Sequence, residues 1–366
     1  MFSVAVAVFI ISSVAASLAL LLVVADRFIA NYGQCTITVN DDRKLSVQGG
    51  KNVLAALTEE KLFIPSACGG RGTCGYCKVK ATDGAGPLLP TETPFLTPDE
   101  VKDNVRLSCQ IKIRNDLKIE IPEELLAVRE FQGVCAAITD MTYDTKLFHF
   151  ELRDPPTIDF VPGQYIQLFC PRYKGNREEV YRAYSIASDP ADNSVVDLII
   201  RRVPDGICTT WCFDFLKAGD VVKFNGPYGE FRLSDTDTPM IWVAGGSGMA
   251  PFVSLLHQMK NDGITRSTTY YFGGNKVKDL FFVDRMREFE RQLDNFEFVP
   301  VVAAPDEGEQ WDGEQGLVTQ ALERRGEDLS GHEGYLCGSP GMIDASIKVM
   351  NRLGIPEERI FYDKFA

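Results

Sequence analysis

The feature that most constrains this chain is a set of four cysteines, three of which lie in one glycine-rich loop. The loop reads Cys68-Gly-Gly-Arg-Gly-Thr-Cys74-Gly-Tyr-Cys77, and Cys109 follows later. Four thiolates are the ligand set of a [2Fe–2S] cluster. The loop glycines suit this role, because they allow positive φ values and can point backbone N–H groups at a compact anion. The sequence therefore predicts a cluster held by these four cysteines.

Two other roles for the cysteines remain open. Structural zinc sites usually pair two Cys-x-x-Cys units, and here only Cys74 and Cys77 have that spacing. Disulfides fit less well, because the redox cofactors that the later motifs indicate belong to a reducing compartment. Most other cysteines lack a repeated ligand spacing and are predicted to be buried thiols: Cys35, Cys135, Cys170, Cys208 and Cys212.

The spacing within the loop points to a group of ferredoxins. Five residues separate Cys68 from Cys74, one more than in the plant-type pattern C-x4-C. The loop is closer to the adrenodoxin spacing. It resembles even more the ferredoxin domain of the F subunits of Na⁺-translocating NADH:quinone reductases, which also has Ala-Cys-Gly-Gly and a later Cys-Gly-x-Cys. The resemblance implies a β-grasp 2Fe-2S ferredoxin domain, which we place at 35–122, and alternation over 111–121 predicts its closing strand.

The chain opens with an apolar run. Residues 2–25 carry no charge, and a helix of that length rises about 36 Å, enough to cross a hydrocarbon core of about 30 Å. No basic segment precedes the run, as a signal peptide would require. We therefore expect a transmembrane helix over 1–28. Lys and Arg occur only after it, so the positive-inside rule places the remaining domains in the cytoplasm. Together with the resemblance, this implies a single-pass protein of the bacterial inner membrane.

Residues 131–234 form a second region, with period-two alternation and regular turn signals that predict an antiparallel β-barrel. It contains Arg182-Ala-Tyr184-Ser185, then Gly206-Ile-Cys-Thr209-Thr210. The order and spacing of these motifs resemble the ferredoxin–NADP⁺ reductase flavoprotein family. The resemblance implies that this barrel binds FAD.

The residue types suit a flavin. A pyrophosphate needs a cation and N–H or O–H donors; Arg182 would supply the charge. Tyr184 would lie against the isoalloxazine ring, and Ser185 would hydrogen-bond near flavin N5. Taken alone, Arg182 could be a surface ion pair and Tyr184 a core tyrosine. The remaining pyrophosphate donors are expected from Gly206, Thr209 and Thr210.

Residues 236–366 predict an α/β nucleotide-binding domain. A buried strand runs into a glycine turn and then a helix, which is typical of a dinucleotide site. The helix N-terminus and close backbone approach favour a pyrophosphate. The expected binding residues are Gly245, Gly246 and Gly248.

Two further segments of this domain match the reductase family. Cys337-Gly338-Ser-Pro resembles the family's Cys-Gly-Pro-Pro, which implies that Cys337 and Gly338 bind beside the nicotinamide and that Cys337 helps to position it. A buried strand cysteine is the alternative. The resemblance also implies that the near-terminal Phe365 stacks on the flavin. Asn275 after the second strand favours NADH over NADPH, although two lysines follow it.

These sites together predict a redox path. A flavin accepts a hydride and releases single electrons, so the order is NADH → FAD → [2Fe–2S] → acceptor. The domain order resembles the F subunits along the whole chain and implies other membrane subunits, or a redox acceptor protein, as partners. An anchored NADH reductase that serves an oxygenase, and a non-catalytic electron carrier, are the alternatives. A net charge of −13 argues against nucleic acid as a partner.

Overall fold

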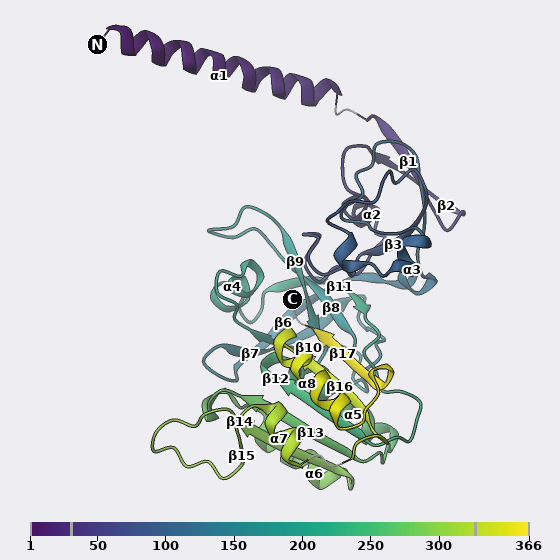
Figure 1. The fold of residues 1–366 in the computed structure, drawn as a ribbon, viewed down its shortest axis with the longest axis vertical. Coiled ribbons are helices and arrows are strands. Elements are labelled where there is room, and N and C mark those ends of the chain that lie inside the picture. The colour runs from purple at the N-terminus through teal and green to yellow at the C-terminus, as the bar shows by residue number, and fades with distance from the viewer. Residues whose placement is uncertain (1, 30–31, 326–327, 365–366) are drawn as a thin grey trace. The chain divides into compact units, whose positions relative to one another are not determined.

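The computed structural model describes residues 2–29, 32–325 and 328–364. The chain divides into two compact units, and each is described by itself (Figure 1). One unit comprises Met1–Pro65 and Gly70–Ala127, and the other comprises Ser66–Gly69 and Val128–Ala366.

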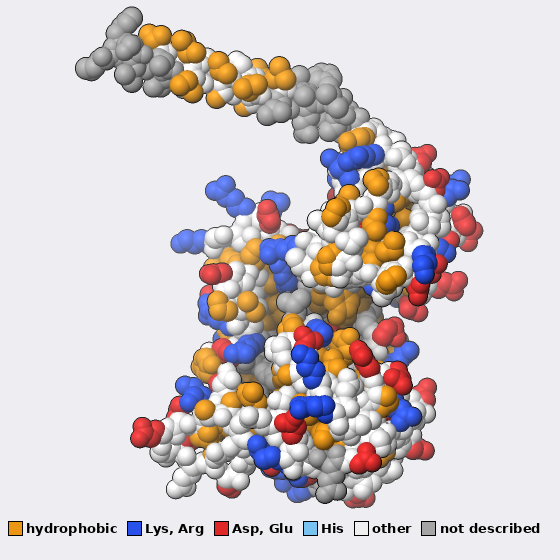
Figure 2. All heavy atoms as spheres, viewed as in Figure 1, with side chains coloured by type: hydrophobic (Ala, Val, Ile, Leu, Met, Phe, Trp, Pro, Cys, Tyr) orange, Lys and Arg blue, Asp and Glu red, His pale blue; other side chains and the backbone are white. Residues whose placement is uncertain are grey.

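The first unit begins with the helix α1 (Phe2–Ile29). This segment contains neither glycine nor proline, the two residues that most disfavour a helix interior. Its described large apolar side chains, from Phe9 to Leu21, are exposed (Figure 2). Among the described residues, no helix is both long enough and apolar enough to cross a membrane.

The rest of the first unit is a mixed sheet packed against one helix. The helix α2 (Val53–Glu59) is capped by Asn52, whose side chain accepts a hydrogen bond from the Ala55 backbone N–H at 2.8 Å. Leu54 and Leu57 of α2 pack in the core against the sheet. The strands, in sheet order, are β2 (Arg43–Gln48), β1 (Gln34–Val39), β5 (Leu117–Glu120), β3 (Lys78–Asp83) and β4 (Val105–Leu107). Shorter elements are η1 (Thr93–Phe95), α3 (Pro98–Lys102) and η2 (Glu123–Ala127).

The closing strand of this sheet is shorter than predicted. Alternation predicts a strand over 111–121, but the structure has only β5 there. The Ile111 N–H donates to the Leu107 carbonyl at 3.2 Å, and the Ile113 N–H donates to the Lys51 carbonyl at 2.9 Å. Side chains in this segment alternate between buried and exposed, because loop hydrogen bonds hold it against the core without a sheet ladder.

The second unit starts with an antiparallel half-barrel. Its edges meet at one isolated bridge, between Ile186 and Leu198. The helix α4 (Ile207–Asp214) packs into the same core. The strands, in sheet order, are β10 (Val195–Arg201), β7 (Thr145–Asp154), β6 (Arg129–Asp140), β11 (Val221–Tyr228), β8 (Tyr165–Cys170) and β9 (Val180–Ser185).

A parallel sheet follows, with helices on both faces. Alternate residues of its strands face two separate cores: Trp242 packs with α5 and α6, whereas Val243 packs with α7 and α8. The strands, in sheet order, are β15 (Glu314–Gln315), β14 (Phe296–Val302), β13 (Thr268–Gly274), β12 (Met240–Gly245), β16 (Glu333–Gly338) and β17 (Ile360–Lys364). The helices are α5 (Met249–Asp262), α6 (Val283–Gln292), α7 (Val318–Arg325) and α8 (Pro340–Arg352), with η3 (Gly246–Gly248), η4 (Val277–Asp279) and η5 (Glu357–Arg359).

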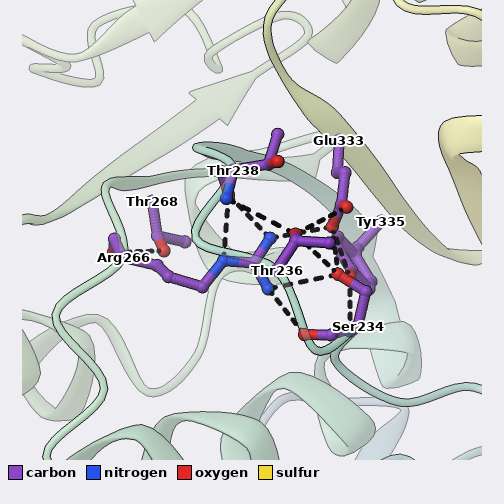
Figure 3. A network of polar contacts seen from close by, with 7 residues as sticks. All are labelled: Ser234, Thr236, Thr238, Arg266, Thr268, Glu333 and Tyr335. Carbon is purple, nitrogen blue, oxygen red and sulfur yellow. Dashed lines mark hydrogen bonds and ion pairs between the residues drawn. The ribbon is translucent and has the colours of Figure 1, made fainter.

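A buried polar network fixes the start of this sheet (Figure 3). The Arg266 guanidinium pairs with the Glu333 carboxylate at 2.8 Å and also donates to the Thr238 carbonyl. Glu333 in turn accepts from the Ser234 hydroxyl at 2.6 Å and the Tyr335 hydroxyl at 2.9 Å. The segment that leads from the half-barrel into β12 is therefore tied to β16.

Candidate functional site

The cysteine loop has the backbone that its glycines predict. Gly69, Gly70, Gly72 and Gly75 have φ values of +68°, +81°, +74° and +74°, a region that side chains rarely adopt. A loop of this kind can turn its amides toward an anion. Three of the predicted ligands are buried and Cys74 is half-buried.

Two of the four cysteines lie together in the first unit. The Ser108 N–H donates to the Cys77 carbonyl at 2.8 Å, which brings the two ligand-bearing segments together. A hydrogen bond with the Cys109 thiol, together with burial, raises the pKa of Cys77. Two such thiols ionise together only when a cation compensates them, as iron does. In the described parts of the chain, no three His, Cys, Asp or Glu side chains converge on a single metal position, so the four-cysteine ligand set stays a prediction.

Three expected flavin residues lie on strand β9, namely Arg182, Tyr184 and Ser185. Arg182 donates to the Tyr181 carbonyl at 2.7 Å, and among the described residues it forms no ion pair. Its charge thus remains available to a pyrophosphate. Ser185 is 4% exposed, and its hydroxyl has no hydrogen-bond partner within the described structure. A buried orphan hydroxyl is costly unless a ligand pairs with it. Arg182 and Ser185 therefore fit FAD.

The two expected threonines, Thr209 and Thr210, lie in the first turn of α4. The Thr209 hydroxyl bonds to the carbonyls of Val203 and Gly206 at 3.3 and 3.2 Å and accepts from the Val203 N–H. It therefore closes its own turn. Thr210 N–H donates to the Gly206 carbonyl at 2.8 Å. The pyrophosphate roles of these residues stay predictions.

The glycine turn between β12 and α5 approaches the neighbouring strand closely. A Cβ on Gly248 would lie 2.3 Å from the Cys337 carbonyl oxygen, so only glycine fits there. Gly246 has φ +56°. The turn leads into the N-terminus of a helix, which suits a pyrophosphate. The structure thus brings together Gly248 and Cys337, two of the residues expected to bind the dinucleotide.

Cys337 lies at the carboxyl end of β16 and is fully buried. Burial raises the pKa of its thiol, and the nearby Asp363 carboxylate adds to this effect. Asp363 lies opposite Cys337 in the pairing of β16 with β17. Sequence reasoning missed Asp363, because only strand register brings it there. Phe365 lies outside the described residues, so its role also stays a prediction.

A second missed residue lies beside the glycine turn. A Cβ on Gly246 would be 3.7 Å from the Arg201 guanidinium. Arg201 is half-exposed, and its Nε donates to Asp144 at 2.7 Å. An ion pair from the half-barrel, Arg201 with Asp144, thus lies beside the turn. Nothing in the sequence indicated that Arg201 and Gly246 are neighbours.

Known domain families match all three parts of the chain. Residues 37–114 match the 2Fe-2S iron-sulfur cluster binding domain. Residues 133–233 match the oxidoreductase FAD-binding domain, and 242–348 match the oxidoreductase NAD-binding domain.

Relatives that match along nearly the whole chain decide the family. The F subunit of the Na(+)-translocating NADH-quinone reductase of Neisseria meningitidis is 32% identical, over 95% of this chain and 96% of that protein. The chain belongs to the family of these F subunits. The corresponding Pseudomonas paraeruginosa protein is 30% identical over 100% of this chain and 99% of its own. The chain is thus an NADH-dependent oxidoreductase with FAD and 2Fe-2S domains, which excludes the non-catalytic carrier.

Solved structures agree with this fold. The Amycolatopsis cytochrome P450 reductase GcoB has a TM-score of 0.73 at 28% identity, covering 90% of this chain and 98% of its own. The ferredoxin reductase of carbazole 1,9a-dioxygenase has a TM-score of 0.69 at 21% identity, covering 91% and 99%. The second likeness shows the fold alone.

Proposed function

We propose that this member of the F subunits is the NADH-entry component of a membrane quinone reductase complex, passing electrons from NADH through FAD and the [2Fe–2S] cluster to an acceptor. The observation that carries the proposal is the near-full-length similarity to the F subunits of Na(+)-translocating NADH-quinone reductases. Bound FAD supplies the conversion of a two-electron hydride into single electrons.

The chain's own residues hold and orient the reactants. Arg182 binds the flavin pyrophosphate, and the orphan hydroxyl of Ser185 donates to the flavin. Gly246 and Gly248 let the NADH pyrophosphate approach the backbone. Cys337 would lie at the nicotinamide end of the site, where its thiol, kept neutral by burial, would add no charge.

Attachment to the membrane is part of the proposal. The uncharged run over 2–25 and the exposed apolar side chains between Phe9 and Leu21 of α1 support an apolar partner for this helix. Sodium translocation would require other subunits, because one helix cannot form an ion path. Deleting 2–29 is expected to release the protein from washed membranes while flavin reduction by NADH persists; retention on the membranes would contradict attachment through α1.

A second candidate is an anchored reductase for an oxygenase. The likeness to the Amycolatopsis cytochrome P450 reductase favours it. Purification of the tagged protein in mild detergent, with partners identified by mass spectrometry, separates the two. Co-purifying multi-helix membrane subunits support the quinone reductase complex, whereas an oxygenase partner overturns it.

The electron order is tested with Cys74→Ser. Anaerobic NADH is expected to bleach the flavin of this variant as in the unsubstituted protein, while reduction of a one-electron acceptor through the cluster is lost. Ser185→Ala serves as the contrasting variant, since it is expected to slow flavin reduction and leave the cluster absorbance intact. Loss of flavin bleaching in Cys74→Ser would contradict the linear order.

A further inference from the structure

The carboxyl end of β13 lies where residues of the protein would distinguish NADH from NADPH, its 2′-phosphorylated form. β12 and β13 are parallel and pair Gly245 with Gly273, so this end lies beside the glycine turn. In nucleotide-binding sheets of this kind, the adenosine ribose reaches the second strand, where an acidic residue suits a free 2′-hydroxyl and a cation suits a 2′-phosphate. Lys276 and Lys278 follow β13, and on sequence alone they offer a phosphate site.

The structure shows that both lysines are already engaged. The Lys276 ammonium pairs with the Asp306 carboxylate at 2.8 Å. The Lys278 ammonium lies 5.7 Å from the centre of the Tyr143 ring, within reach of a cation–π contact. A 2′-phosphate would have to compete with these partners for both cations.

Backbone bonds hold Asp306 in this place. The Ala303 N–H donates to the Gly274 carbonyl at 2.9 Å, and the Ala304 N–H donates to the Asn275 carbonyl at 3.1 Å. The chain that leads to Asp306 therefore runs alongside the end of β13. The Lys276 ammonium, with a contribution from Lys278, lowers the pKa of Asp306, so the carboxylate stays ionised at neutral pH.

A second carboxylate lies at the same turn. Asp279 accepts from the Lys276 backbone N–H at 2.9 Å through Oδ2. Its other oxygen, Oδ1, is buried and has no hydrogen-bond partner among the described residues. A phosphate dianion placed here would meet two carboxylates, and like charges of this kind disfavour a ligand.

We infer that Asp306, by holding Lys276, makes this end of the site reject the 2′-phosphate of NADPH and so selects NADH. The inference rests on the NADH oxidation proposed above and adds the residues that exclude the phosphorylated cofactor. Asp306 acts through Lys276 and is a positioning residue.

The test compares Asp306→Asn with Glu307→Gln in the full-length holoenzyme. Both variants remove one negative charge from the same exposed loop, but Glu307 forms no hydrogen bond or ion pair with either lysine in the described structure. The ratio of kcat/KM for NADPH to that for NADH, measured by flavin reduction, is expected to rise about tenfold in Asp306→Asn, the gain of one charge-assisted contact. Glu307→Gln is expected to leave this ratio unchanged.

Binding provides a readout that does not depend on turnover. Calorimetry should show that Asp306→Asn binds adenosine 2′,5′-bisphosphate about tenfold more tightly than the unsubstituted protein does. The affinity for 5′-AMP should not change. Adding Lys276→Ala to Asp306→Asn should remove the gain, because the freed ammonium causes it. An equal shift in Glu307→Gln, no shift in Asp306→Asn, or persistence of the gain without Lys276 would overturn the inference.

The two proposals fail in different ways. If NADH does not reduce the flavin of the unsubstituted protein, the proposed function is overturned. The bisphosphate measurement would still decide the role of Asp306.

Discussion

The buried ion pair at the start of β16 allows the energetics of the nucleotide-binding sheet to be tested (Figure 3). Glu333 is 4% exposed and Arg266 is 7% exposed. Glu333 accepts from Arg266, and also from Ser234 and Tyr335. Replacing Glu333 by Ala would leave a buried guanidinium without its carboxylate, and the hydroxyl groups of Ser234, Thr236 and Tyr335 without this acceptor.

The magnitude follows from this burial. Removing one partner of a buried pair costs about 3–5 kcal/mol, because the other charge stays buried and uncompensated. For a unit of about 150–250 residues, each kcal/mol lowers Tm by about 2–4 °C. Glu333→Ala should therefore lower the Tm of the second unit by about 6–20 °C.

The assay is thermal unfolding followed by circular dichroism, with a matched surface variant. Glu297 pairs with Arg325, and their side chains are 52% and 33% exposed. Glu297→Ala removes the same kind of charge pair but should cost at most about 1 kcal/mol.

Activity gives a further control, because Glu333 and Cys337 lie at opposite ends of β16, about 13 Å apart along the strand. At 25 °C the KM for NADH should be unchanged in Glu333→Ala. If its Tm falls no further than that of Glu297→Ala, the reasoning from burial is refuted.

Three further predictions concern the sites and the pH. Arg182→Ala should weaken FAD binding about 10- to 100-fold while the cluster absorbance stays; titration of the apoprotein with FAD checks this. Gly248→Ala should lower kcat/KM for NADH about 100-fold with FAD content unchanged, because its Cβ would meet the Cys337 carbonyl. Burial lowers the pKa of His257 below 6.5, so stability should fall as pH drops below this value; His257→Gln should flatten this dependence in denaturant titrations.

Local motifs carried most of what the sequence predicted correctly. The cysteine loop, the Arg182 to Ser185 motif and the glycine turn each lie within a few residues, and their order along the chain carried the resemblance to the ferredoxin and reductase families. The three matching domain families follow the same order. The predicted domain boundaries and ligand roles stay predictions.

Features that depend on long-range contacts were not predictable in this way. Asp363 reaches Cys337 only because β17 pairs with β16 in one register. Asp306 reaches Lys276 only because the chain after β14 lies beside β13. Thr209 was expected to donate to the flavin pyrophosphate; its hydroxyl bonds to the carbonyls of Val203 and Gly206 here, a local contact that residue type does not reveal, and its role stays a prediction.

The positions of these residues in the sheet separate catalysis from cofactor choice. Cys337 is on β16, which is paired on both sides and fully buried, so a change there disturbs two ladders and the contact with Gly248. Asp306 and Lys276 are side chains at strand ends with 53% and 35% exposure, where an ion pair contributes about 0–1 kcal/mol to stability. A substitution of Asp306 or Lys276, which would alter cofactor choice, therefore lowers the stability of the fold little. A substitution on β16, at the nicotinamide end of the site, lowers it much more. We expect variants with altered preference for NADH to map to the ends of β13 and β14, while substitutions on β16 reduce activity with either cofactor.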